Sequence, residues 1–415
     1  MKNKISRRDF LANSALVSAA VMMPGFLRAT GNNLSTFNGK RLIVVQLTGG
    51  NDGLNTVIPF SNDLYYSNRP DIGIKQTEII RLNDDLGFHP SLDSFTDLWE
   101  QGSMSILNNV GYPNPNRSHF RSRDIWQSAS DENQNLNTGW IGRSFDAKCN
   151  SGECMLPHNA IEIDSSLSLI LRGDKFNGLA MDKPSELAPG LKNPVIKTFS
   201  SLDLTDTTTN HDFLYKELVS TYQSADYVMS KSKIYASTIA YPQTEFSKGL
   251  KTVAELIVSG SETKVYYLSL PGFDTHVSQN NFQPKQLRTL ADGLNTLYTD
   301  LKQNNEWNNT LVVVYSEFGR RVKQNGGRGT DHGTANNVFL FGGNLNKLGI
   351  LNELPNLTDL NDGDLKHTVD FRSVYATILN KWLNVDPVTV LQREFPLLDF
   401  IVRIYVKMET VTLSE

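Results

Sequence analysis

Short apolar runs rich in β-branched residues alternate along this chain with longer stretches whose apolar positions recur at helical spacing. Residues 42–47, 264–270 and 310–315 are runs of the first kind, and they predict strands buried on both faces. Residues 247–259 and 286–303 are stretches of the second kind, and they predict amphipathic helices. Strands that alternate with helices predict an α/β fold: a doubly wound, mostly parallel sheet with helices on both faces.

The same patterns predict weaker elements between these. Strands are expected at 104–110 and 338–341, and helices at 91–101, 211–238 and 368–383. Residues 131–210 are polar and loop-rich, with short candidate strands at 160–163 and 167–171, so we expect an insertion or lid rather than core. One domain of residues 36–400 would carry this insertion, and residues 401–415 would form a C-terminal tail.

The first 35 residues indicate export. They have a basic start, a modest apolar stretch and the sequence Ser6-Arg7-Arg8-Asp9-Phe10-Leu11, which closely matches a twin-arginine signal. The apolar stretch, residues 11–27, is short and is interrupted by Asn13 and Pro24, which argues against a membrane anchor. No later apolar stretch is long enough to span a bilayer. We expect a periplasmic or extracellular location, with the twin-arginine export machinery as a partner.

Charge and motif spacing argue against two classes of function, nucleic-acid binding and dinucleotide-dependent oxidation. Over 415 residues the net charge is -4, and no basic run occurs outside the N-terminus, so nothing indicates nucleic-acid binding. The sequence GGNDG after the first strand lacks the G-x-G-x-x-G spacing, which argues against a dinucleotide-dependent oxidoreductase. The two cysteines, Cys149 and Cys154, would form a local disulfide in an oxidising compartment, and the alternative is a free pair.

Acidic and imidazole side chains follow several predicted strands. They are Asp52, Asp274, His276, Glu317 and His332. Because parallel strands bring their carboxyl ends to one edge of a sheet, we expect these side chains to converge. Mixed carboxylate and imidazole ligands suit a divalent metal ion, zinc or manganese ahead of calcium or magnesium. Two such ions about 4 Å apart would clamp the oxygens of a phosphate-like ester. The alternatives are backbone capping, turn hydrogen bonds and an ion pair between Glu317 and a neighbouring arginine.

A second cluster consists of Arg117, Ser118 and His119, which follow a stretch of prolines and asparagines. Ser118 stands where a helix N-cap belongs, and its hydroxyl could serve as a nucleophile activated by a metal ion. Arg117 or His119 would hold an anionic group there, because helix N-termini favour anions. The alternative is a capping serine with exposed neighbours. All three are candidate catalytic residues.

These residues lie in motifs that resemble those of one family. The leader and the motifs LTGGNDGLNTVIP, RSHF, GFDTH, SEFGR, TDHGTAN and DFRSVYATILNKWL are similar to those of the exported domain-of-unknown-function 1501 family, over nearly the whole mature chain. That family resembles, more distantly, the alkaline phosphatase and sulfatase superfamily. The resemblance implies that Asp52 and Glu317 flank one metal ion and that Asp274, His276 and His332 bind another.

The chain departs from the superfamily at four places. The Asp274/His276 pair is spaced more tightly than in phosphatases, and Ser118 is one place off the nucleophile register. Glu317 is followed by Phe318 where relatives have an Asp-His pair, and Pro113 stands where sulfatases have a modified cysteine, which argues against a formylglycine sulfatase. The resemblance implies an exported, metal-dependent hydrolase of phosphate- or sulfate-type esters whose substrate is an anionic ester or glycan. The alternative is a non-catalytic binding protein of the cell envelope built on the same fold.

Overall fold

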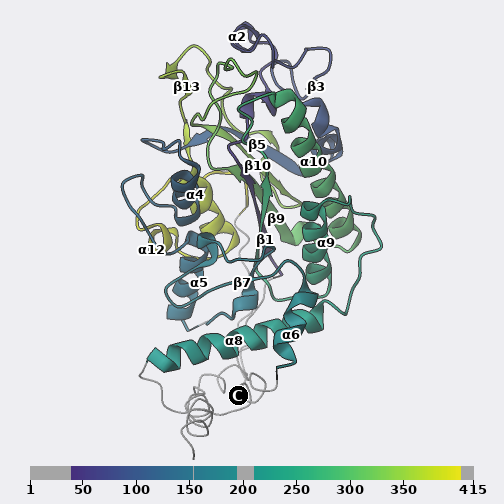
Figure 1. Ribbon diagram of the computed structural model, residues 1–415, viewed down its shortest axis with the longest axis vertical. Coiled ribbons are helices and arrows are strands. Elements are labelled where there is room, and N and C mark those ends of the chain that lie inside the picture. The colour runs from purple at the N-terminus through teal and green to yellow at the C-terminus, as the bar shows by residue number, and fades with distance from the viewer. Residues whose placement is uncertain (1–38, 153, 194–209, 403–415) are drawn as a thin grey trace, which may run out of the picture.

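The main sheet of the protein positions every candidate residue. The computed structural model describes residues 39–152, 154–193 and 210–402. Within them the largest sheet has nine strands (Figure 1). Eight follow one another in the order β11 (Gly349–Ile350), β5 (Met104–Gly111), β10 (Asn336–Gly342), β9 (Thr310–Ser316), β1 (Arg41–Thr48), β8 (Val265–Pro271), β6 (Ala160–Glu162) and β7 (Leu179–Ala180). The ninth strand, β14 (Val369–Asp370), pairs with β5.

Most strands of this sheet run in the same direction. Strands β9, β1, β8, β6 and β7 pair in parallel. Strand β10 is antiparallel to both of its neighbours, β9 and β5. The predicted α/β class with a mostly parallel sheet is confirmed. The reversal of β10 matters for the site, because it brings the segment before β10 to the edge where β1, β8 and β9 end.

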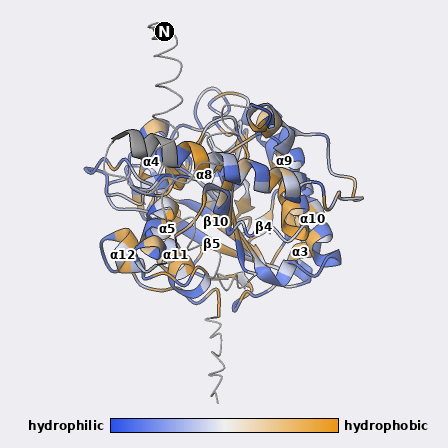
Figure 2. Ribbon diagram, turned by 90° about the horizontal axis from the view of Figure 1, so that it is seen from below, coloured by the Kyte–Doolittle hydropathy of each residue, from blue (hydrophilic) through white to orange (hydrophobic). Residues whose placement is uncertain are grey.

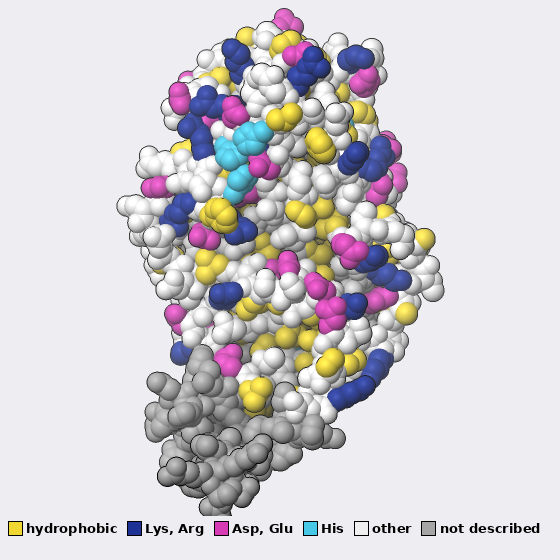
Figure 3. Space-filling model, in the orientation of Figure 1, with side chains coloured by type: hydrophobic (Ala, Val, Ile, Leu, Met, Phe, Trp, Pro, Cys, Tyr) yellow, Lys and Arg dark blue, Asp and Glu magenta, His cyan; other side chains and the backbone are white. Residues whose placement is uncertain are grey.

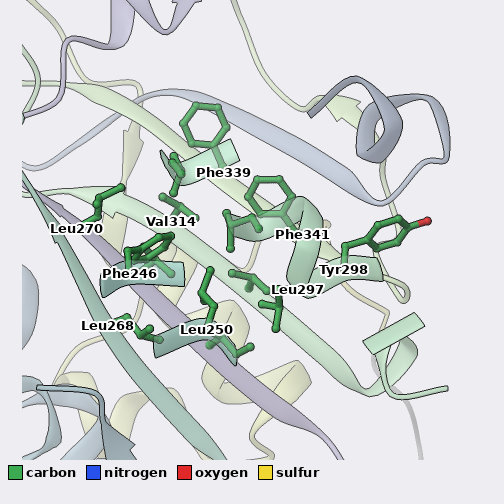
Figure 4. Packing of buried hydrophobic residues seen from close by; sticks show 14 of the residues in the cluster. Phe246, Leu250, Leu268, Leu270, Leu297, Tyr298, Val314, Phe339 and Phe341 are labelled. Atoms are coloured by element: carbon green, nitrogen blue, oxygen red, sulfur yellow. The ribbon is translucent and has the colours of Figure 1, made fainter. Parts of the chain in front are cut away.

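Side chains of the central strands alternate between two apolar layers. In β1, Ile43, Val45 and Leu47 belong to one buried cluster, whereas Leu42 and Val44 belong to the other. Burial on both faces makes the strand a continuous apolar run in the sequence. Figure 4 shows side chains of the first cluster packed together between the strands and the helices on that face of the sheet.

Helices cover both layers, and Figure 2 shows them in two groups on either side of the sheet. The first cluster includes residues of α9 (Glu245–Val258) and α10 (Gln279–Gln303). The second includes residues of α4 (His119–Ser128), α5 (Trp140–Asn150), α11 (Phe371–Thr377) and α12 (Pro387–Leu391). Helices on both faces confirm the doubly wound arrangement.

The other elements are short or lie at the periphery. They are the helices α2 (Asp63–Asn68), α3 (Thr96–Glu100), α6 (Ala188–Leu191) and α8 (Asn210–Lys231), a sheet of β2 (Val57–Ile58), β3 (Ile80–Arg81) and β4 (Gly87–Phe88), and the pair β12 (Leu360–Asn361) and β13 (Asp364–Leu365). The helix expected at 91–101 is a 3-10 segment, Pro90–Phe95, followed by α3. The helix expected at 368–383 is shorter: α11 follows β14 and ends in a π-helical turn, Ile378–Trp382.

The expected insertion at 131–210 is in part core, which corrects that expectation. Strand β6 lies inside the main sheet between β8 and β7. Trp140, Ile141 and Phe145 of α5 are buried in the second apolar cluster. The segment has a polar composition because β6 has only three residues and long loops surround it. Residues 194–209 lie outside the described residues.

The predicted disulfide between Cys149 and Cys154 is present. The predicted signal segment, residues 1–35, lies outside the described residues, as does the predicted tail from residue 403 onward. Across the described ranges, no helix combines the length and apolar character needed to cross a bilayer.

A buried acid in β6 yields a prediction about stability. Glu162 is 1% exposed and accepts hydrogen bonds from the backbone nitrogen (2.6 Å) and the hydroxyl (2.5 Å) of Ser168. Burial raises the pKa of Glu162 to about 7, against the opposing hydrogen bonds from Ser168. A folded-state pKa above the unfolded value contributes stability that is complete below about pH 4.5 and is lost as the pH rises through about 7.

We therefore expect Glu162→Gln to remove one part of the pH dependence of unfolding. Between about pH 4.5 and pH 8, the free energy of unfolding of the wild type should fall relative to the variant by about 3 kcal/mol, at about 1.4 kcal/mol per pKa unit. Urea unfolding of both proteins at several pH values measures the difference. Parallel curves for the two proteins would contradict the prediction.

Candidate metal centre

Segments next to four strands meet at one edge of the main sheet. Asp274 and His276 follow β8, Glu317 follows β9, and His332 lies in the loop that leads into β10. His119 is the first residue of α4, the helix that follows β5. Figure 3 shows histidine side chains gathered in one surface patch with acidic side chains beside it. Four of the five residues that were expected to converge, Asp274, His276, Glu317 and His332, therefore lie at one edge, together with His119.

Asp274 is the centre of this cluster. Its Oδ1 lies 3.0 Å from Nε2 of His276 and 3.4 Å from Nε2 of His332. Its Oδ2 lies 3.5 Å from Nε2 of His119. The two Nε2 atoms of His276 and His332 are 2.9 Å apart. Ligand atoms of His119, Asp274 and His332 all lie within 4.8 Å of one another, as in a site for a metal ion.

The second ring nitrogen of two of these histidines is held by an acceptor. Nδ1 of His332 lies 2.7 Å from the carbonyl oxygen of Arg117, and Nδ1 of His276 lies 3.2 Å from Oδ1 of Asp331. A carbonyl only accepts, so Nδ1 of His332 carries the proton and its Nε2 presents a lone pair. His276 lies between two carboxylates, Asp331 at Nδ1 and Asp274 at Nε2, so its Nε2 presents a lone pair only in the tautomer that donates to Asp331. Burial lowers the pKa of His332, which favours this neutral form.

His119 has the same arrangement. Its Nδ1 lies 3.0 Å from Oε1 of Glu317, and Glu317 also accepts a 2.8 Å hydrogen bond from the backbone nitrogen of Gly49. Nε2 of His119 is buried and has no hydrogen-bond partner in the described structure. Three imidazoles are thus oriented by oxygen acceptors while their Nε2 atoms converge, which is how histidine ligands of metal ions are held.

Phe318 lies against the cluster. Its ring centroid is 4.9 Å from that of His119 and 4.8 Å from that of His332. Its side chain is 2% exposed. The buried ring limits the rotation of both imidazoles and excludes water from one side of the site.

Arg320 connects the loops that carry these residues. Its fully buried side chain donates to the carbonyl oxygens of Gly50 (2.6 Å) and Thr330 (2.7 Å) and to Oδ1 of Asp274 (2.6 Å). Burial alone would raise the pKa of Asp274, but the hydrogen bond and charge of Arg320 keep that pKa below its ordinary value. Asp274 is therefore an oriented carboxylate.

The approach of the β1 loop to the Asp274 loop requires glycine at position 49. Gly49 has φ +120°, and a Cβ there would lie 2.4 Å from the backbone nitrogen of Asp274. Both the positive φ and the lack of space exclude other side chains without a backbone shift.

Asp52 is not brought into the cluster. Its carboxylate is 1% exposed, and its Oδ2 accepts from Nη1 of Arg69 (2.5 Å) and Nε2 of Gln279 (2.6 Å). Among the described residues no hydrogen bond or ion pair joins it to Glu317, so the structure does not support the expected pairing of these two acids around one metal ion. No local pattern near Asp52 indicates that Arg69, 17 positions later, neutralises it.

The predicted cluster of Arg117, Ser118 and His119 is divided by the structure. Nε of Arg117 donates to Oδ2 of Asp364 at 2.9 Å, so its charge already has a partner. Ser118 is the N-cap residue of α4, as predicted, but its exposed hydroxyl makes no capping hydrogen bond. His119 joins the metal-type cluster, although its sequence neighbours Arg117 and Ser118 had indicated a substrate-binding role for it.

The comparisons with known proteins agree with the resemblance drawn from the motifs. The chain belongs to the family described as protein of unknown function (DUF1501), whose model matches residues 39–397. No curated protein matches the sequence.

Solved structures overlap with this one at low identity. The zinc complex of the C-terminal periplasmic domain of EptC from Escherichia coli is 11% identical, with 73% of this chain and 72% of that chain covered and a TM-score of 0.35. The lipoteichoic acid synthase LtaP from Listeria monocytogenes is 10% identical, with 82% and 73% covered and a TM-score of 0.33. Alkaline phosphatase from the Antarctic bacterium TAB5 is 10% identical, with 75% and 93% covered and a TM-score of 0.33.

The buried hydrogen bonds of Arg320 predict that removing its guanidinium group lowers the free energy of unfolding strongly. Arg320→Met would leave Asp274 and several buried carbonyl groups without their donor, which costs about 3–5 kcal/mol of unfolding free energy. Arg321→Met is the matched control, because Arg321 is partly exposed and pairs with Asp362 at 3.2 Å on the surface. It also lies 3.7 Å from Asp364, but Arg117 remains there as a closer partner of that carboxylate. The control should cost about 1 kcal/mol or less. Denaturant unfolding of both variants measures this, and equal losses would refute the role given to Arg320.

Proposed function

We propose that this protein, as a member of a family of unknown function, is an exported metal-dependent hydrolase of phosphate- or sulfate-type esters. The observation that carries the proposal is the convergence of three imidazole Nε2 atoms on the carboxylate of Asp274. Two imidazole lone pairs 2.9 Å apart repel each other unless a proton or a cation lies between them. A divalent cation removes this repulsion, and the ligand atoms of His119, Asp274 and His332 lie close enough together to hold it.

The proposed ligands are His119, Asp274, His276 and His332. Contacts of 2.9–3.5 Å link their ligand atoms. Four donors placed tetrahedrally about a zinc ion are separated by about 3.3 Å, given bond lengths of about 2.0–2.1 Å. Three imidazoles and a carboxylate favour zinc or manganese over calcium or magnesium.

In this proposal two acidic residues orient histidine ligands and do not bind the metal ion themselves. Glu317, expected from the sequence to be a ligand, orients His119, and Asp331 orients His276. Such partners fix the tautomer and raise the basicity of the imidazole ligand. Asp52 is left out of the ligand set, because Arg69 already neutralises it.

The residues around the cluster suit hydrolysis of an anionic ester. A divalent cation held there supplies a Lewis acid for an ester oxygen and lowers the pKa of water. Ser118 remains the proposed nucleophile, because its hydroxyl is exposed, unused in capping and next to His119. The guanidinium of Arg117, 40% exposed, would contact the anionic group of the substrate.

We place the protein in the periplasm or the extracellular space. The twin-arginine motif at Arg7 and Arg8 supports export through that machinery. The disulfide between Cys149 and Cys154 suits an oxidising compartment. The substrate would then be an anionic ester or a glycan ester found outside the cytoplasm.

Metal binding is the first test. Chelator-treated protein should bind zinc or manganese, and an ion at 100 times its dissociation constant should stabilise the fold by about 2.7 kcal/mol. Asp274→Ala and His332→Ala should abolish this rise in melting temperature. His367→Gln, a half-buried histidine outside the cluster, is the control and should retain it. A protein that neither binds divalent ions nor gains stability from them has no metal centre of the kind proposed.

Turnover is the second test. Metal-loaded protein should hydrolyse at least one member of a panel of phosphomonoesters, phosphodiesters and sulfate esters. Asp274→Ala should lower kcat/KM by on the order of 100-fold or more. Ser118→Ala should lower kcat while the metal content stays unchanged. Metal-loaded protein inactive on the whole panel would favour the alternative, a non-catalytic binding protein of the cell envelope.

A further inference from the structure

A second polar cavity lies at the opposite end of α4 from the metal centre. It has a volume of about 180 Å³ and lies where α4 ends and where α5, α11 and the segment after α12 meet. Figures 1 and 2 show these helices grouped on one side of the sheet. The residues that carry the argument are Ser130, Asp131, Arg143, Arg372, Arg393 and Phe395.

The cavity wall contains more positive than negative charge. Arg372 pairs with Asp370 at 2.6 Å and with Asp131, and Arg393 pairs with Asp131 at 3.3 Å. One carboxylate in the lining, Asp131, therefore faces three guanidinium groups, because Arg143 is the third. Asp370 pairs with Arg372 but does not line the cavity. A cation at a partly buried position is costly unless an anion compensates it.

Arg143 is the uncompensated cation. It donates to the carbonyl oxygens of Ser128 (2.6 Å), Thr138 (2.7 Å) and Val390 (2.8 Å), which are neutral acceptors. Asp174 and Asp146 attract it only at longer range. Burial lowers the pKa of Arg143 to about 10, as expected for a guanidinium without a bound counter-ion.

Ser130 supplies an independent indication of a missing ligand. Its side chain is 2% exposed, and its hydroxyl oxygen is buried with no hydrogen-bond partner among the described residues. A buried hydroxyl without a partner costs about 1–3 kcal/mol. An acceptor oxygen that entered the cavity would satisfy it.

Phe395 keeps two of the arginines in place. The guanidinium carbons of Arg372 and Arg393 lie 4.9 Å and 4.8 Å from the centroid of its ring. Guanidinium groups packed against a ring keep their N–H groups free to donate in plane, which suits recognition of a multi-oxygen anion.

We propose that this cavity binds a small tetrahedral oxyanion, a phosphate or sulfate group, contacted by Arg143, Arg393 and Ser130. The site is distinct from the metal centre, because α4 has 10 residues and so separates the two by about 15 Å. The anion is either free or the terminal group of an ester. The proposal does not depend on the hydrolase activity.

The test uses the full chain after chelator treatment, so that the metal centre contributes no anion binding. Calorimetric titration with inorganic phosphate and with sulfate, at low ionic strength, should give one saturable site that chloride does not occupy. A phosphomonoester sugar in a parallel titration distinguishes the two sources: tighter binding than phosphate indicates an ester terminus, and weaker binding indicates the free ion.

Two variants locate the site. Arg393→Gln should weaken phosphate binding about tenfold, the loss of one charge-assisted hydrogen bond. Ser130→Ala should weaken it several-fold and should keep the fold, because the hydroxyl makes no hydrogen bond in the protein. Arg81→Gln, an exposed arginine elsewhere, should bind as the wild type does. No saturable binding, or binding that neither cavity variant changes, overturns the proposal.

Discussion

The buried guanidinium of Arg320 is the interaction on which the candidate site depends. It joins the loop after β1, through Gly50, to the loop before β10, through Thr330, and it fixes the carboxylate of Asp274 between them. No side chain with fewer donors could satisfy these groups together. A fully buried cation is stable only when every donor has a partner, so the three loops must adopt one arrangement. The position of Asp274, and with it the point where the imidazoles converge, follows from that requirement.

The direction of β10 is the second constraint. In an entirely parallel sheet, the segment before β10 would lie at the opposite edge, and His332 would be far from Asp274. Because β10 is antiparallel to β9, its first residue lies beside the carboxyl ends of β1 and β8. The carbonyl of Arg117 and the carboxylates of Asp331 and Glu317 then hold the imidazoles. The site is therefore oriented by the protein itself, at the cost of mutual repulsion that a cation would remove.

Much of this architecture could be predicted from the sequence. Continuous apolar runs located β1, β8 and β9, and the residues after them included Asp274, His276 and Glu317. Partner choice could not be predicted, because burial and long-range pairing decide it. Asp52 has the same local pattern as Asp274, but Arg69 reaches Asp52 and makes it an internal ion pair. His119 appeared to belong to a substrate cluster, because nothing local reveals that α4 brings it to Glu317. The strand at 160–163 was predicted, but its place inside the main sheet was not, because β6 has only three residues.

Aromatic stacking explains why the two ends of α4 keep their positions. The ring of Trp126, within α4, stacks on Tyr315 at 4.8 Å and on Phe371 at 4.3 Å. Tyr315 lies two residues before Glu317, which orients His119, and Phe371 precedes Arg372 at the anion cavity. These three rings are buried in the second apolar cluster. Close packing of stacked rings there resists a displacement of α4 relative to the sheet and α11. A shift of α4 that moved His119 away from Asp274 would therefore also disturb this stack and the packing beside the cavity. The helix is held as a rigid spacer between two sites of different chemistry.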